Sequence, residues 1–163
     1  GDNEILADFV SDATEHLEAT ESHLLTLEND PENTEAINAV FRAFHTIKGI
    51  AGFLNLKSVQ LLSHEAENLL DLARNGKIEL RADALEVVLH ATDALLAIVV
   101  DVRAFLVGER SRTSTISARL IKNLQAVQNG QPTETLSPPR VAKPKPAKPE
   151  SIAEITVPKT PSR

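Results

Sequence analysis

Apolar side chains recur every three or four residues through most of the chain, which is the spacing of an amphipathic α-helix. Period-two alternation is missing, so no β-strand is predicted. Ser58 is expected to cap the third helix, and the pair Asn75-Gly76 is expected to end it. The pattern predicts five helices, over about residues 3–28, 33–54, 58–74, 81–107 and 113–128.

Short connections between long helices favour antiparallel neighbours. The predicted fold class is therefore all-α, an up-down antiparallel four-helix bundle with an additional C-terminal helix packed alongside. The segment over about 81–107 is apolar over much of its circumference, so we expect it to be the most buried helix. An alternative is that the first helix packs on a partner rather than in the bundle.

Proline divides the chain into two parts. Eight of the nine prolines lie beyond residue 130, and the ninth is Pro31. We therefore predict a helical domain over residues 1–130 and a flexible interdomain linker over 131–163, disordered and rich in proline and lysine. The alternative for this tail is a docking peptide, for which Ile152–Val157 is the only apolar piece.

Charge and composition exclude several classes of function. Residues 131–163 carry a net charge of +3, which leaves 11 basic and 20 acidic residues in 1–130. An acidic body argues against nucleic-acid binding, which needs clustered Lys and Arg. Cysteine is absent, which excludes disulfides and zinc thiolate sites. No apolar run is long enough to span a membrane and no signal peptide is evident, so a cytoplasmic protein without membrane contact is expected.

The second predicted helix carries an unusual group of residues beside its apolar face. On a helical wheel His45 falls just outside the apolar arc, and Lys48, Gly49 and Gly52 flank it. Each glycine costs about 1 kcal/mol relative to alanine inside a helix. The two glycines are therefore expected to leave a path to the imidazole. The alternative is that they let two helices approach closely and that His45 is an ordinary boundary residue.

The third predicted helix carries a polar strip made of His64, Glu67 and Asp71 at spacings of three and four. A carboxylate that accepts the Nδ1–H of a histidine fixes its tautomer and leaves Nε2 outward as a nucleophile. A glutamate facing His45 across a helix pair would serve this purpose. The alternative for this strip is a solvated helix face.

The runs His45-Thr-Ile-Lys-Gly-Ile-Ala-Gly52 and His64-Glu-Ala-Glu-Asn-Leu-Leu-Asp71 together resemble the histidine phosphotransfer (HPt) domain of CheA-type chemotaxis histidine kinases. The resemblance spans roughly residues 4–107. It implies that His45 is the phosphoacceptor and that Glu67 holds its Nδ1–H. It also implies that Lys48 is a cation near the phosphoryl oxygens, that His64 is a network partner of His45, and that Gly49 is kept bare for the incoming partner.

The same resemblance implies a place in a two-component phosphorelay. His45 would accept the γ-phosphoryl group of ATP from a separate kinase catalytic domain and pass it to an aspartate in the receiver domain of a response regulator. The chain lacks a Gly-rich phosphate loop and an Asp cluster for Mg²⁺. We therefore expect no cofactor in this domain, ATP and Mg²⁺ being bound by partner domains, and no enzyme activity by the domain alone. A monomer is expected.

Two other functions compete with this hypothesis. One is a helical adaptor that docks a partner without being phosphorylated. The other is a carboxylate–histidine metal bundle, which is disfavoured because it needs Glu-x-x-His, whereas the order here is His64-x-x-Glu67. His16, His23 and His90 are expected to be surface or boundary residues.

Overall fold

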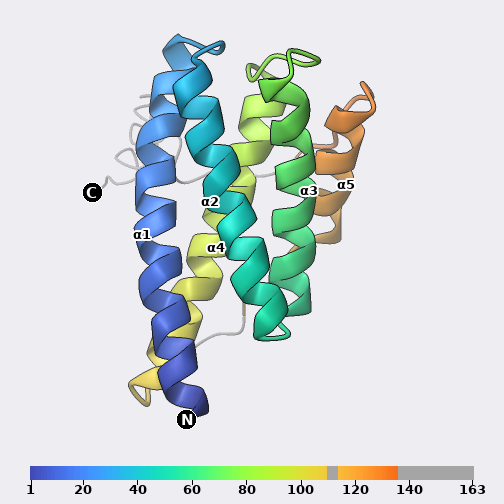
Figure 1. Cartoon of the computed structure of the whole chain (residues 1–163). Helices are drawn as coiled ribbons and strands as arrows, with labels where there is room; N and C mark the ends of the chain where they lie inside the picture. Colours follow the sequence, from blue (N-terminus) through green and yellow to red (C-terminus); the bar gives the residue numbers. More distant parts are fainter. Residues whose placement is uncertain (110–113, 136–163) are drawn as a thin grey trace, which may run out of the picture.

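The computed structural model describes residues 1–109 and 114–135, and within these ranges it contains helices and no strand. The five helices are α1 (Asp2–Asn29), α2 (Thr34–Phe53), α3 (Lys57–Arg74), α4 (Asp83–Leu106) and α5 (Ala118–Gln128). Figure 1 shows α1 to α4 running alternately up and down, with α5 beside α3. The predicted all-α bundle with an additional helix is confirmed.

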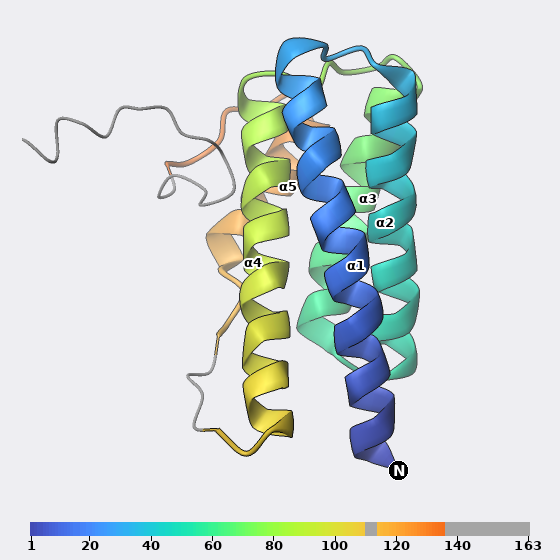
Figure 2. The same ribbon diagram turned by 90° about the vertical axis from the view of Figure 1, so that its left-hand side faces the viewer.

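Apolar side chains from all five helices meet in one core. The first helix packs between α2 and α4, so its predicted place in the bundle is confirmed (Figure 2). Burying a large aliphatic or aromatic side chain contributes about 1.5–3 kcal/mol each. Almost completely buried members of this core include Leu17, Leu24, Phe44, Leu70, Leu95 and Leu124.

The turns before α2 and α3 are built differently. The Asn33 side chain accepts a hydrogen bond of 2.9 Å from the Ala36 N–H and so caps α2. The predicted cap of α3 at Ser58 is wrong, because α3 already begins at Lys57 with Leu56 in the cap position and no side-chain cap. The Gln60 N–H bonds to the Leu56 carbonyl at 2.9 Å, which places Ser58 inside the first turn.

The last two helices begin later than predicted. The fourth begins at Asp83, because Ala82 has a φ of 51°, a left-handed conformation that a helix does not continue through. The fifth begins at Ala118, where the Ser117 side chain accepts hydrogen bonds from the first turn. Ser114 lies outside the helix because its N–H bonds at 2.6 Å to the Asp101 carboxylate of α4.

The expectation that α4 is the most buried helix holds only for its first half. Its last two turns extend with the start of α1 beyond the ends of α2 and α3 (Figure 1). Val100 and Phe105 are accordingly 57% and 63% exposed. Within the described residues, none of the helices combines the length and apolar character needed to cross a membrane.

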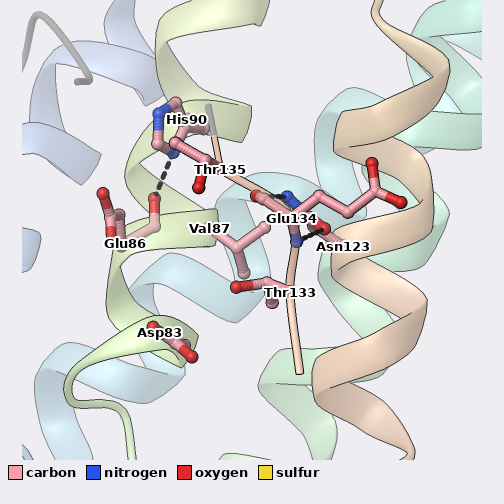
Figure 3. Close-up of a pocket in the computed structure, with 8 residues that line it drawn as sticks. All are labelled: Asp83, Glu86, Val87, His90, Asn123, Thr133, Glu134 and Thr135. Atoms are coloured by element: carbon pink, nitrogen blue, oxygen red, sulfur yellow. Dashed lines mark hydrogen bonds between the residues drawn. The ribbon is translucent and has the colours of Figure 1, made fainter. Parts of the chain in front are cut away.

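The first residues of the predicted linker are held against the bundle. Asn123, only 3% exposed, donates its side-chain N–H to the Glu134 carbonyl and accepts the Glu134 N–H, both at 2.8 Å. This pair of bonds is visible in Figure 3, beside a cavity of about 290 Å³ between α4 and residues 133–135. The ordered body therefore reaches at least residue 135. The rest of the predicted linker, including Ile152–Val157, lies outside the described residues.

Replacing Asn123 with alanine should release residues 131–135 from the bundle, because both hydrogen bonds to Glu134 are lost. We expect a loss of about 1–2 kcal/mol in the free energy of unfolding. The Glu134 amide, protected from hydrogen exchange in the unaltered chain, should exchange freely in the variant. The exposed Asn129→Ala is the control, and unchanged protection of Glu134 in Asn123→Ala would show that the side chain is not the anchor.

Candidate functional site

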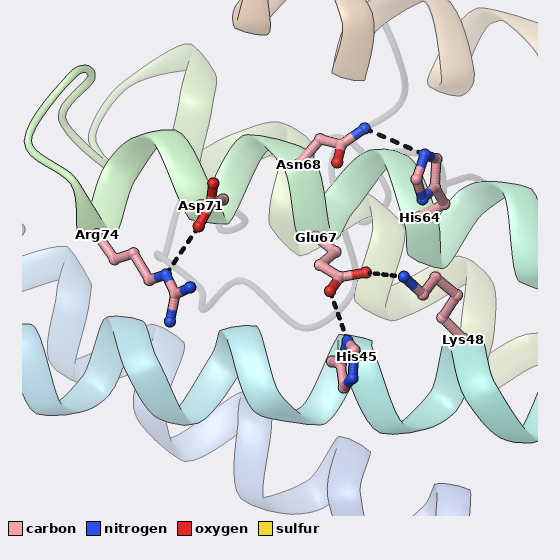
Figure 4. Close-up of polar contacts among 7 residues, drawn as sticks. All are labelled: His45, Lys48, His64, Glu67, Asn68, Asp71 and Arg74. Carbon is pink, nitrogen blue, oxygen red and sulfur yellow. Dashed lines mark hydrogen bonds and ion pairs between the residues drawn. The ribbon is translucent and has the colours of Figure 1, made fainter.

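The pairing of α2 with α3 brings His45 and Glu67 face to face. His45 lies in the middle of α2, and Glu67 lies in the middle of the antiparallel α3 (Figure 4). The His45 Nδ1 atom is 2.6 Å from Glu67 Oε2, so the carboxylate can accept the Nδ1–H of a neutral imidazole. This contact leaves Nε2 as the unprotonated nitrogen of the ring.

Lys48 binds the second oxygen of the same carboxylate. The Lys48 Nζ atom is 2.6 Å from Glu67 Oε1, and the two atoms form an ion pair. Their contact does not have the angles of a hydrogen bond. Lys48 lies three residues after His45, so both side chains leave α2 on one face. Glu67 is thus bound on one side by the imidazole and on the other by the ammonium.

The charge of Glu67 is stabilised by these two neighbours. Its burial alone would raise the pKa of the carboxyl group. The close contacts of the carboxylate with Lys48 and with His45 outweigh this effect and lower the pKa of Glu67 below its ordinary value. The group is therefore an anion at neutral pH and an acceptor for the Nδ1–H.

The two partners differ strongly in exposure. The His45 side chain is 61% exposed, whereas the Glu67 side chain is 11% exposed. The carboxylate therefore holds the imidazole from inside the bundle, while the ring itself faces solvent. An exposed, oriented Nε2 can act as a nucleophile toward a group carried by a partner protein.

An aromatic neighbour on α2 was not predicted from the sequence. The Phe41 and His45 rings are nearly parallel, 10° apart in plane, with centroids 6.2 Å apart. The Arg74 guanidinium lies 3.9 Å from the Phe41 ring centroid, and Asp71 binds its Nε at 2.9 Å. Phe41 fits the apolar stripe of α2 and so looks like a core residue. Its spacing of four residues from His45 is the signal that could have found it.

His64 does not touch His45 in the described contacts. Its Nε2 is 3.4 Å from the Asn68 side-chain nitrogen, on the exposed side of α3 (Figure 4). It lines a groove together with Lys48, so it lies near the site without joining the His45–Glu67 pair. Its role as a network partner stays a prediction.

The two glycines near His45 have different surroundings. A Cβ placed on Gly49 would meet nothing within 4 Å, so this position is open to solvent. A Cβ on Gly52 would lie 2.8 Å from the Gln60 side-chain nitrogen of α3. Gly49 is therefore bare toward open space, whereas the missing side chain at Gly52 leaves room for the end of the Gln60 side chain. That either glycine clears a path to the imidazole stays a prediction.

The described residues contain no group of three or more His, Cys, Asp or Glu side chains arranged to hold a metal ion. His16, His23 and His90 are each partly exposed, as expected for boundary positions. Among the histidines of the chain, His45 is the one whose ring is held by a buried carboxylate in the contacts described above. A helical bundle that exposes a histidine oriented by a buried carboxylate has the arrangement that the predicted phosphotransfer module requires.

The family model described as "Hpt domain" matches residues 4–100, and the chain belongs to this family. It is 35% identical over 124 residues to the sensor histidine kinase CheAY of Helicobacter pylori, covering 76% of this chain and 15% of that protein. It is 33% identical over 138 residues to the chemotaxis protein CheA of Bacillus subtilis, covering 83% of this chain and 20% of that protein. The chain thus spans about a fifth or less of the length of these relatives.

Solved structures agree with this assignment. The CheA phosphotransferase domain from Thermotoga maritima is 39% identical with a TM-score of 0.60, over 62% of this chain and 96% of that one. The phosphorylated P1 domain of CheA3 from R. sphaeroides, solved in complex with CheY6, is 27% identical with a TM-score of 0.67, over 78% and 98% of the two chains. The resemblance to CheA-type phosphotransfer domains is confirmed.

The lowered pKa of Glu67 predicts how the stability of the fold depends on pH. A carboxyl group whose pKa is lower in the folded than in the unfolded state stabilises the fold above its unfolded pKa, and this contribution is lost as the pH falls through the folded pKa. At pH 7 the unaltered chain should be more stable than Glu67→Gln by about 1 kcal/mol. Urea unfolding should show this difference shrinking as the pH is lowered toward 3. The exposed Glu18→Gln of α1 is the control, and a difference independent of pH would contradict the ion pair.

Proposed function

We propose that this chain is the phosphoacceptor domain of a chemotaxis-type two-component histidine kinase. His45 accepts the γ-phosphoryl group of ATP from a separate kinase catalytic domain and passes it to an aspartate in the receiver domain of a response regulator. The observation that carries the proposal is the 2.6 Å contact between His45 Nδ1 and the buried Glu67 carboxylate, behind an exposed imidazole. The phosphorylated relative solved with CheY6 supports a response regulator as one partner.

The transfer follows from the geometry of the imidazole. The lone pair of His45 Nε2 forms the N–P bond while the bond from the γ-phosphorus to the bridging oxygen of ADP breaks. Nδ1 keeps its proton, which Glu67 accepts as a hydrogen bond, so the positive charge that develops on the ring is stabilised. Such transfers depend on positioning and on charge stabilisation. In the second step the aspartate oxygen attacks the same phosphorus and His45 leaves.

Other parts of the relay are assigned to partner domains. ATP and Mg²⁺ are bound by the kinase catalytic domain, and Mg²⁺ again by the receiver, so this domain acts as carrier and not as an enzyme by itself. We place the domain in the cytoplasm as a monomer. Lys48 serves as the cation near the oxygens of the transferred phosphoryl group, and His64 serves as a network partner that tunes His45. A docking adaptor without phosphorylation is the alternative function.

Incubation with a kinase catalytic domain and ATP tests the proposal. The unaltered chain should gain acid-labile, base-stable phosphate, and His45→Gln should gain none. Glu67→Gln should be phosphorylated about 100-fold more slowly with its fold intact, because the ring loses its orientation. Lys48→Ala should lose about tenfold, since it stabilises charge without attacking. His90→Gln is the matched control. Full phosphorylation of His45→Gln would overturn the assignment, and an unaffected Glu67→Gln would remove the role of Glu67.

The variant Gly49→Ala separates the effect of Gly49 on the stability of the fold from its effect on the partner's access to His45. Alanine is favoured over glycine inside a helix by about 0.5–1 kcal/mol, and the added Cβ meets no neighbour, so the variant should unfold at higher urea concentration. If Gly49 is bare for the incoming partner, its phosphorylation should nevertheless slow by several-fold.

The matched control for Gly49→Ala is Gly52→Ala. Its Cβ would meet the end of the exposed Gln60 side chain of α3, which has to move, so that variant should gain less stability. Unchanged phosphorylation of a stabilised Gly49→Ala would leave Gly49 without a role in partner access.

A further inference from the structure

Two adjoining hollows run from the phosphoacceptor site across α3 to α5. The first, of about 560 Å³, is lined by Lys48, Lys57, Gln60, Leu61 and His64. The second, of about 370 Å³, is lined by Ser58, Leu61, Ile116, Ala118, Ile121 and Lys122. Leu61 lines both and is 47% exposed, so the two hollows meet at this residue and together make one surface. We call it the α3–α5 groove; Figure 1 shows these two helices side by side.

The charge of the groove is opposite to that of the rest of the domain. The described residues hold 21 Asp and Glu but only nine Lys and Arg, and α1 alone has eight acidic and no Lys or Arg side chains. Three of the nine basic side chains, Lys48, Lys57 and Lys122, line the groove, and no acidic side chain does. Its floor is apolar, with Leu61, Ile116 and Ile121. A partner surface that fits carries an apolar side chain surrounded by carboxylates.

The groove is continuous with the reaction site through Lys48, which also binds Glu67. Phosphorylation of His45 would add about two negative charges beside this end of the groove. The attraction for an acidic partner is therefore strongest before transfer and falls after it. This favours the partner that binds the unphosphorylated domain and must leave after transfer, which is the kinase, over the receiver, which must bind the phosphorylated form.

We propose that the α3–α5 groove is the docking surface for the kinase catalytic domain, which presents an apolar side chain with an acidic rim. This inference rests on the proposed function and deepens it. The fifth helix then has a function besides packing, because its residues Ile121 and Lys122 line the groove. Docking here places the kinase beside Lys48 and the exposed imidazole.

Binding can be measured without phosphorylation, with the catalytic domain of the Helicobacter pylori CheAY kinase as the probe. In the His45→Gln background, calorimetry should show that Lys57→Glu and Lys122→Glu each raise the Kd about tenfold. Leu61→Ala should also weaken binding several-fold. The matched control is Lys77→Glu, which makes the same charge change beyond the opposite end of α3 and should leave the Kd unchanged. Added salt should weaken binding of the parent chain more than that of Lys57→Glu.

Kinetics in the His45 chain give the second readout. Lys57→Glu should raise the KM for phosphorylation about tenfold at constant kcat, while transfer from the phosphorylated chain to CheY6 of R. sphaeroides keeps its rate. Equal effects of Lys57→Glu and Lys77→Glu, no binding by the parent chain, or slowing of the CheY6 step alone would overturn the docking surface. Groove-dependent binding with no phosphate on His45 would instead overturn the proposed function and leave the surface in place.

Discussion

The buried Glu67 carboxylate is the group on which the site depends. A carboxylate taken out of water is costly unless it is paired, and Glu67 finds both of its partners, His45 and Lys48, on the neighbouring helix. The two contacts come from residues one turn apart, so they can be satisfied together in only one register of α2 against α3. The same pairing of helices that offsets the cost of burying the Glu67 carboxylate therefore fixes the orientation of the imidazole.

The bundle keeps this pairing at its surface instead of in its core. Phe44 and Ile47 flank His45 in the sequence and are fully buried, which fixes the face that α2 turns inward. His45 then has to leave the helix at the edge of that face, with its ring 61% exposed. Phe41 and Arg74 stand on one side of the ring, while the absent side chain of Gly49 leaves the other approach open. The orientation of the imidazole by the buried carboxylate and the access of a partner to the imidazole thus depend on different residues.

The helices could be predicted from the sequence because they depend on local spacing. The pairing of His45 with Glu67 was implied by the family resemblance, since spacing alone left the polar strip of α3 open to being a solvated face. Leu62, Ala66 and Leu69 set the buried face of α3, and Glu67 lies at its edge. Spacing could not distinguish Gly49 from Gly52, since what a missing side chain does depends on the neighbouring helix. The start of α3 was missed because Ser58 is a good cap by composition, whereas the chain already turns at Leu56. Phe41 was missed because an aromatic residue on an apolar stripe has the same pattern whether it packs inward or against a histidine.

The position of Lys48 suggests why a lysine is useful beside a nucleophilic histidine. A doubly protonated imidazole has no lone pair on Nε2, so a nucleophilic histidine needs a neutral ring. Because Lys48 shares the charge of Glu67, the carboxylate can accept the Nδ1–H without carrying its full attraction for another proton. Under the proposed function, the phosphoryl group on His45 is carried on the same face of α2 as this ammonium. Lys48 then acts before transfer by balancing part of the charge of Glu67 and after it by balancing the phosphate, so that one cation serves both states of the proposed carrier.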